Sequence, residues 1–243
     1  MESGSLGGLG EVWFAPNTGH RGVAVEDDMV GVAPWRYMMI VVVEGISAAG
    51  KTTWCRSHGR SYLIPETFPA DRKAQPLTGI ATAQYWTDWN ARRWGDAHQI
   101  EREKGRAICD TDPLKLHYSW CLCQIDALPK RQWELQLQTT RTALREERLG
   151  FADAYFVKVI DYLTAKQQCQ GDTSRVRDRF ELHFRLQPFL IRWYELLEKA
   201  LGGRVLWRLP DDGLPADATL ASELRYDINV FDRFVSSLET KAT

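Results

Sequence analysis

One short stretch near residue 45 constrains the fold of this chain more than any other part of the sequence. It reads Val43-Glu44-Gly45-Ile46-Ser47-Ala48-Ala49-Gly50-Lys51-Thr52-Thr53, and an apolar run at 39–43 leads into it. The two glycines allow tight turns, so that successive backbone N–H groups can face one anion. The G-x-x-x-x-G-K-T spacing after an apolar run predicts a strand, a phosphate-binding loop (P-loop) and a helix, in that order.

The residues of this loop have distinct expected roles toward a nucleoside triphosphate. We expect Lys51 to reach the β- and γ-phosphates and the Thr52 hydroxyl to bind Mg²⁺. The N–H groups of the loop and the positive end of the following helix would hold the remaining phosphate oxygens. The predicted nucleotide-binding residues are Gly45, Ser47, Ala48, Ala49, Gly50, Lys51, Thr52 and Thr53.

The rest of the chain alternates short apolar runs with longer amphipathic ones from Met39 onward. This alternation is typical of an α/β fold, in which helices cover both faces of a parallel sheet. The predicted strands are 39–44, 61–65, 106–110, 154–161 and 204–208. The predicted helices are 50–58, 78–104, 113–127, 130–148, 178–201 and 218–239.

Residues 1–37 are rich in glycine and short polar residues, and their apolar residues show no sustained helical or strand period. We predict that they form a poorly structured N-terminal extension and that the folded domain is 38–243. Met38 and Met39 directly precede the first predicted strand. We therefore expect the natural start of translation at this pair.

Composition argues against several classes of protein. The formal net charge of the 243 residues is −1, and no lysine or arginine block is long enough to follow a nucleic-acid backbone. Five scattered cysteines give neither a disulfide framework nor a zinc-site spacing, which favours a reducing cytoplasm. No apolar run approaches the length of a membrane span. We expect no nucleic-acid or membrane partner.

Carboxylates follow two of the predicted strands. Glu66 comes after the second strand, and Asp110 and Asp112 come after the third. Because the carboxyl ends of parallel strands gather functional residues, these side chains are expected beside the P-loop. Phosphoryl transfer needs a metal ligand and a carboxylate that orients or deprotonates the acceptor. We predict Glu66 for the acceptor and Asp110 for Mg²⁺ or the acceptor. Asp112 acts in place of Asp110, binds substrate, or only caps a helix starting at Pro113.

Arginines alternate along Arg175-Val176-Arg177-Asp178-Arg179, after a polar loop at 168–174. Such a segment can fold over a triphosphate and stabilise charge on the γ-oxygens. A solvated, charged helix start is the alternative interpretation. We predict a lid in which Arg175 binds nucleotide and Arg177 and Arg179 are catalytic.

These motifs together resemble the deoxyribonucleoside kinases. Glu44-Gly45 with Ala48-Ala49-Gly50-Lys51-Thr52 is similar to their P-loop, Ile64-Pro65-Glu66 to the segment with their catalytic carboxylate, and 205–210 to the strand before their adenine-binding loop. Asp178-Arg179-Phe180-Glu181 is also similar to the lid of thymidylate kinases, and Asp110-Thr111-Asp112 to ribosylnicotinamide kinases. The resemblance implies a three-layer P-loop fold with a five-stranded sheet in the order 2-3-1-4-5. It also implies pairing into homodimers.

The resemblance further implies that the helix around 81–94 lines the acceptor pocket. Tyr85, Trp86 and Trp89 lie on one face of that helix by spacing, with Arg93 beside them. They are predicted to bind a flat ring, although a buried core stripe needs the same spacing. Two positions depart from the family: Thr111 replaces an arginine and Leu116 replaces an aspartate, so a normal deoxynucleoside is not assured. Lys115 and His117 are candidate replacement cations or surface residues.

The sequence thus predicts an ATP- and Mg²⁺-dependent kinase acting on a hydroxyl of a nucleoside or nucleoside-like acceptor. A nucleoside monophosphate kinase is the alternative if Arg92 and Arg93 supply cations to the acceptor pocket. An ATPase or nucleotide-dependent switch is the alternative of a different class. Stimulation of ATP consumption by an acceptor distinguishes the kinases from the switch.

Overall fold

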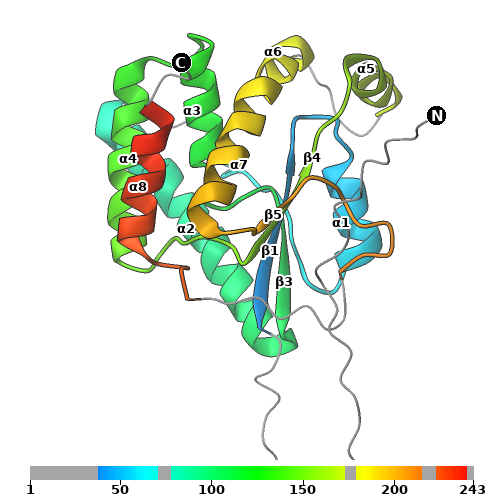
Figure 1. Ribbon diagram of the computed structural model, residues 1–243, viewed down its shortest axis with the longest axis horizontal. Helices are drawn as coiled ribbons and strands as arrows, with labels where there is room; N and C mark the ends of the chain where they lie inside the picture. The colour runs from blue at the N-terminus through cyan, green and yellow to red at the C-terminus, as the bar shows by residue number, and fades with distance from the viewer. Residues whose placement is uncertain (1–37, 71–77, 173–178, 215–222, 240–243) are drawn as a thin grey trace, which may run out of the picture. The chain divides into compact units, whose positions relative to one another are not determined.

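Five parallel strands form the sheet at the centre of the fold (Figure 1). The computed structural model describes residues 38–70, 78–172, 179–214 and 223–239. The strand order is β2-β3-β1-β4-β5, which confirms the order 2-3-1-4-5. The strands are β1 (Met39–Gly45), β2 (Leu63–Ile64), β3 (Arg106–Asp110), β4 (Ala154–Lys158) and β5 (Val205–Leu206).

Helices cover the two faces of the sheet unequally. In Figure 1, α1 lies on one side of the strands, and α2, α3, α4, α7 and α8 lie on the other. The α5 and α6 helices lie beyond the carboxyl ends of the strands, at the top of the same view. The helices described are α1 (Lys51–Gly59), α2 (Gly79–Lys104), α3 (Leu116–Gln124), α4 (Lys130–Arg145), α5 (Tyr162–Gly171), α6 (Phe180–Arg185), α7 (Gln187–Leu201) and α8 (Ile228–Glu239).

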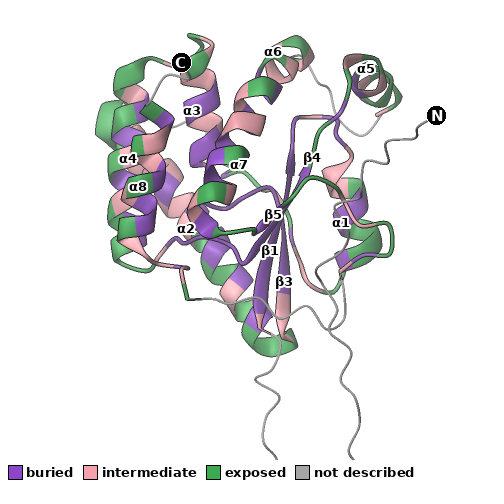
Figure 2. Cartoon of the chain, viewed as in Figure 1, coloured by how far each residue is buried: buried purple, intermediate pink, exposed green. Residues whose placement is uncertain are grey.

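The central strand β1 is buried along its whole length, and its side chains supply two separate cores (Figure 2). Alternate residues of a strand point to opposite faces of the sheet. Met39, Val41 and Val43 pack with Trp54 of α1 in the smaller core. The other face packs Ile40 and Val42 into the larger core under the remaining helices. Burial on both faces explains why this segment reads as one continuous apolar run.

The two edge strands are shorter than predicted. β2 pairs only with β3, and β5 pairs only with β4, so each hydrogen-bonds along one side alone. Both have only two residues, against predictions of 61–65 and 204–208. Strand β4 also ends earlier than predicted, at Lys158, because α5 begins four residues later. Edge pairing depends on neighbours that the sequence pattern does not specify.

The helix α5 was not predicted. Its N-cap is Asp161, whose carboxylate accepts hydrogen bonds from Thr164 N at 2.9 Å and Thr164 Oγ1 at 2.7 Å. An aspartate followed by a helical turn is an ordinary N-terminal signal, so the sequence did contain this information. The predicted strand at 154–161 had included this cap.

Three predicted helices need correction. The helix predicted at 113–127 begins only at Leu116, because Lys115 takes a left-handed backbone conformation with φ 50°. The segment predicted as one helix at 178–201 divides into α6 and α7 around Leu186. In the last predicted helix, 218–239, the described helix α8 begins at Ile228, and 215–222 lie outside the described residues.

The chain divides into two units, Met1–Ala33 and Pro34–Thr243, and all described residues belong to the second. The predicted extension at 1–37 lies outside the described residues, so its boundary stays a prediction. Within the described part of the chain, no helix has both the length and the apolar character needed to cross a membrane.

A buried ionic cluster ties the segment before α8 to the amino ends of the central strands. Arg225 donates to both carboxylate oxygens of Glu101 on α2, at 2.9 and 2.6 Å, and also to Asp153. Asp153 in turn accepts a hydrogen bond from Ile40 N at 2.7 Å. Both carboxylates are fully buried. Removing Arg225 therefore leaves two buried charges without their main partner.

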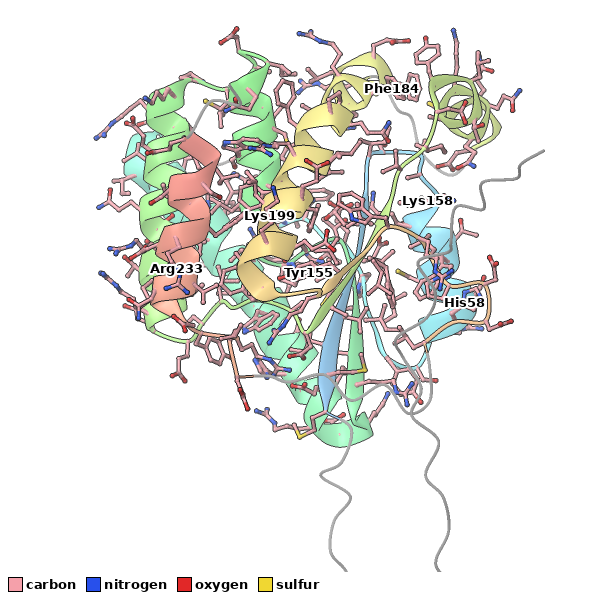
Figure 3. The ribbon with its side chains drawn as sticks, viewed as in Figure 1. His58, Tyr155, Lys158, Phe184, Lys199 and Arg233 are labelled. Atoms are coloured by element: carbon pink, nitrogen blue, oxygen red, sulfur yellow. The ribbon has the colours of Figure 1, made fainter. Side chains whose placement is uncertain are left out.

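We expect Arg225→Met to lower the free energy of unfolding by about 3–5 kcal/mol, because breaking a buried ion pair costs this much. Arg233→Met is the matched control, since Arg233 is exposed on α8 (Figure 3). The control should change the free energy of unfolding by no more than about 0.5 kcal/mol. Urea denaturation followed by circular dichroism measures both variants. Equal stabilities of the two variants would contradict a structural role for the cluster.

Candidate functional site: a phosphate-binding loop facing two carboxylates

The loop between β1 and α1 has the backbone geometry that its glycines predict. Gly50 adopts φ 83° at the N-cap of α1. A Cβ on Gly45 would lie 2.6 Å from the carbonyl oxygen of Lys158 on β4, which is too close for any side chain. Figure 3 labels Lys158 beside this loop. The two glycines are therefore required, one by backbone conformation and the other by close approach to β4.

The Lys51 ammonium lies within the concave loop. Its Nζ donates to the carbonyl oxygens of Gly45 at 2.6 Å and Ile46 at 3.0 Å. Neither contact involves the apolar core. The loop also contains Ser47, Ala48 and Ala49, and it leads into Thr52 and Thr53 in the first turn of α1. The predicted nucleotide-binding residues of the P-loop thus run from the end of β1 through the loop to the first turn of α1.

Asp110 lies at the end of β3, directly beside the first turn of α1. Its Oδ2 accepts a hydrogen bond of 2.6 Å from Thr52 Oγ1. Burial raises the pKa of Asp110, although the Thr52 hydroxyl and the charge of Lys51 act in the opposite direction. The structure therefore brings together the two residues predicted to hold Mg²⁺.

The oxygen atoms at this position suit a magnesium ion. Among the described residues, the buried Oδ1 of Asp110 has no hydrogen-bond partner. Mg²⁺ prefers oxygen ligands and is commonly held by one or two protein groups plus phosphate oxygens and water. No cluster of three or more His, Cys, Asp or Glu side chains capable of binding a metal occurs in the described part of the chain. Thr52 and Asp110 would therefore hold the ion together with a bound triphosphate.

Glu66 follows β2 and carries its carboxylate toward Lys115, at the start of α3. Lys115 Nζ lies 2.6 Å from Glu66 Oε1. Burial would raise the pKa of Glu66, but the charge and hydrogen bond of Lys115, with the charges of Lys51 and Arg93, lower it to about 2. Glu66 is therefore ionised throughout the physiological pH range.

Arg93 of α2 hydrogen-bonds to the backbone at the ends of β2 and β3. Its guanidinium donates to the carbonyl oxygens of Asp110 at 2.9 Å and Thr111 at 3.1 Å, and of Pro65 at 3.3 Å. The side chain is only 4% exposed. The predicted substrate contact of Arg93 stays a prediction, and these contacts favour a role in positioning Glu66 and Asp110.

Asp112 lies on the core side of the site. Its side chain is 1% exposed, and Oδ1 accepts a hydrogen bond of 2.9 Å from Leu114 N. This bond closes a turn before α3, so Asp112 does not cap a helix that begins at Pro113. Burial raises the pKa of Asp112 to about 7. Its predicted substrate contact is not favoured by this burial.

Glu44, inside the P-loop motif, is a buried carboxylate that organises the loop. Its Oε1 accepts from Gly45 N at 2.9 Å, and its Oε2 accepts from Asp112 N at 3.1 Å. His117 Nε2 lies 3.3 Å from the same Oε2. His117 is 3% exposed, so it is not a surface residue. An acidic residue in an apolar strand was the sequence signal for this role.

Three aromatic residues of α2, Tyr85, Trp86 and Trp89, belong to neither core. Tyr85, Trp86 and Trp89 are each half-buried, whereas Trp94 is 1% exposed and belongs to the larger core. Trp89 Nε1 donates to the carbonyl oxygen of Thr67 at 3.0 Å, one residue after Glu66. Trp89 is therefore partly exposed beside the Glu66 segment, where its ring is available for stacking on a flat acceptor.

Two short helices flank the predicted arginine lid. The α5 and α6 helices pack through Tyr162, Phe180 and Phe184, with the rings of Tyr162 and Phe184 5.0 Å apart between centroids. Figure 3 labels Phe184 where α6 faces α5. Arg179 is exposed directly before α6, and its charge lowers the pKa of nearby His183 alongside the larger effect of burial. Arg175 and Arg177 lie outside the described residues.

The similarity of this chain to known proteins is limited to its structure. Two solved structures are similar to it: a NadR protein in complex with NR, with TM-score 0.44, and a NadR protein in complex with NAD and AMP-PNP, with TM-score 0.41. Each is 20% identical and covers 86% of this chain. This chain spans about half of those proteins, 55% and 52% respectively. No family model and no curated protein matches the sequence.

The contact between Lys115 and Glu66 was not predicted from the sequence. The sequence left it as a replacement cation or a surface residue, and the structure brings its ammonium onto Glu66. The spacing between Asp110 and α3 could not reveal this contact, because it depends on the left-handed backbone at Lys115.

Proposed function

We propose that this chain is a kinase that transfers the γ-phosphate of ATP to a hydroxyl of a nucleoside or nucleoside-like acceptor. The main support is the convergence of three groups at one edge of the sheet. Thr52 and Asp110 are joined by a hydrogen bond of 2.6 Å. Arg93 donates both to the carbonyl oxygen of Asp110 and to that of Pro65, the residue before Glu66. A P-loop, a metal ligand and an acceptor-side carboxylate are the parts that phosphoryl transfer requires.

In the proposed reaction, the P-loop residues bind the triphosphate and Glu66 orients the acceptor. Lys51 and the N–H groups from Gly45 to Thr52 would bind the triphosphate, and Mg²⁺ would neutralise charge on its oxygens. Glu66 would accept a hydrogen bond from the acceptor hydroxyl and orient its oxygen for in-line attack. Since its pKa is about 2, Glu66 is a weak base and would act mainly by orientation until the new bond is largely formed.

A hydroxyl acceptor is better supported than a phosphate acceptor. A monophosphate kinase would need free cations from Arg92 and Arg93 in the acceptor pocket. Arg92 is exposed to solvent, and the guanidinium of Arg93 is engaged with backbone carbonyl groups. The half-buried rings of Trp86 and Trp89 favour an acceptor with a flat ring.

A panel of acceptors tests this proposal. Nucleosides, nucleoside monophosphates and nucleoside antibiotics are incubated with ATP and Mg²⁺, and the gain of one phosphate is read by mass spectrometry. We expect at least one nucleoside-like hydroxyl compound to gain phosphate and to stimulate ATP consumption. Phosphorylation of monophosphates alone would favour the nucleotide kinase. Hydrolysis that no acceptor stimulates would favour the ATPase or switch.

The proposed role of Arg179 in the lid leads to a separate prediction. We expect Arg179→Ala to lower kcat about 10-fold, because a cation near the transferring group stabilises its charge. Arg192→Ala on α7 is a control of the same type, since Arg192 pairs with the exposed Glu195 at a distance of 4.0 Å. Steady-state kinetics with saturating ATP measures both. Unchanged turnover of Arg179→Ala would remove this arginine from the lid.

A further inference from the structure

The ion pair between Lys115 and Glu66 is partly exposed and belongs to neither core. The side chains are 22% and 24% exposed, so both are accessible to a small molecule yet partly removed from water. The Lys115 ammonium also lies 5.5 Å from the ring centroid of Tyr118. A lysine held by a carboxylate on one side and an aromatic face on another has a fixed position.

The backbone at Lys115 has an unusual conformation that directs this side chain toward Glu66. Lys115 has φ 50° and ψ 5°, a left-handed conformation that costs a lysine roughly 1 kcal/mol or more. The neighbours Leu114 and Leu116 are 1% and 0% exposed, and Lys115 N donates to the carbonyl oxygen of Asp112 at 3.0 Å. The core therefore holds both sides of the strained residue. Strain maintained in this way commonly marks a functional position.

Several charged groups face Glu66, and Lys115 dominates among them. The largest effect on the pKa of Glu66 is burial, which raises it. The next largest is the charge of Lys115, which lowers the pKa, followed by the charge of Lys51. Arg93 of α2 adds a smaller effect of the same sign. The other titratable groups near Glu66 are Asp110 at the end of β3, His117 and Tyr118 of α3, and His183 of α6.

We propose that Lys115 is a positioning residue for phosphate transfer: it fixes one oxygen of Glu66, so that the other oxygen receives the acceptor hydroxyl. This inference rests on the proposed kinase function. In the reaction, the acceptor oxygen forms a bond to the γ-phosphorus, and the bond from that phosphorus to the bridging oxygen of ADP breaks with its electrons on ADP. The hydroxyl proton passes late to the second oxygen of Glu66 and then to solvent.

Lys115 also sets the timing of this proton transfer. A carboxylate paired with an ammonium group is a weak base, so it cannot take the proton before the new bond forms. A late transfer suits the loose transition state of phosphoryl transfer, in which the attacking oxygen carries little extra charge. The same ion pair therefore gives the carboxylate its position and its low basicity.

The first test measures the ion pair without catalysis. The carboxyl carbon of Glu66, labelled with ¹³C and assigned by comparison with Glu66→Gln, is titrated by NMR in the wild type and in Lys115→Met. We expect Glu66 to remain ionised at about pH 4 in the wild type. In Lys115→Met its pKa should rise toward or above the ordinary 4.5, because the nearest cation is gone. Identical titrations in the two proteins would overturn the inference.

The second test uses an acceptor identified by the panel above. Lys115→Met should lower kcat about 10- to 100-fold at neutral pH and move the acid limb of kcat/KM upward by about two pH units. Lys115→Arg should restore most of the turnover and the position of the acid limb, since it keeps the charge. Lys130→Met, at an exposed position in α4, should behave as the wild type.

The outcomes separate the two proposals. If the wild-type protein phosphorylates no acceptor, the proposed function fails. If the wild type is active and Lys115→Met retains its kcat and its acid limb, only the role of Lys115 fails. Circular dichroism and the unfolding temperature of Lys115→Met show whether a loss of activity reflects misfolding. In that event Lys115→Gln, which is one atom shorter, keeps a hydrogen-bond donor and carries no charge, decides the question by the same pH profile.

Discussion

Replacing Lys51 with alanine is expected to remove phosphate transfer, lowering kcat by roughly 10³-fold or more. Lys51 is the cation inside the P-loop, and its Nζ lies at the carbonyl oxygens of Gly45 and Ile46. Charge developing on the transferring group would lose its closest protein cation. The fold should survive, because the side chain contributes nothing to either core. Initial rates and the unfolding temperature measure the two effects separately.

Lys104→Ala is the matched control for this variant. Lys104 also donates to a backbone carbonyl oxygen, that of Ser61, at 2.7 Å, but it lies at the exposed end of α2. Both variants lose a lysine and one local set of hydrogen bonds, and only Lys51→Ala loses a cation in the P-loop. Wild-type turnover in Lys51→Ala would defeat the assignment of the site, whatever the control shows.

The sequence predicted the centre of the fold better than its edges. Central strands such as β1 are buried on both faces, so their residues must be apolar along the whole length, and 39–44 was predicted almost to the residue. The edge strands β2 and β5 have one partner each, and their two-residue lengths depend on tertiary pairing. The helix α5 was missed although Asp161 supplies an ordinary cap.

The candidate site was predictable where it follows the topology of the sheet. Asp110 lies beside Thr52 because both follow neighbouring parallel strands, and this relation needs only the strand order. The Lys115 contact needs a left-handed residue in a turn, which no spacing rule supplies. Likewise, the burial of His117 depends on α3 packing against α7, where Trp193 lies 6.2 Å from its ring.

Glu66→Gln is the second variant for which we expect a large effect, a fall in kcat of about 10²-fold or more with little change in ATP affinity. Glutamine has nearly the same shape, but its neutral amide accepts a weaker hydrogen bond from the acceptor hydroxyl. It also leaves Lys115 without its carboxylate partner, which is only 2.6 Å away in the wild type. Isothermal titration with a non-hydrolysable ATP analogue measures donor affinity, and single-turnover kinetics measures transfer.

Comparison of the change in ATP affinity with the change in transfer rate distinguishes a role of Glu66 in catalysis from a structural role. In the proposed reaction Glu66 contacts the acceptor from its position after β2, whereas the groups proposed to bind the triphosphate lie between β1 and α1. A loss confined to transfer therefore places the effect on the acceptor, and Glu103→Gln, an exposed carboxylate paired with Gln99 on α2, should show neither loss. Equal losses of ATP affinity and turnover in Glu66→Gln would instead mean that the carboxylate holds the site together by anchoring Lys115. Lys115→Met would then reproduce both losses, and the role of Glu66 would be structural.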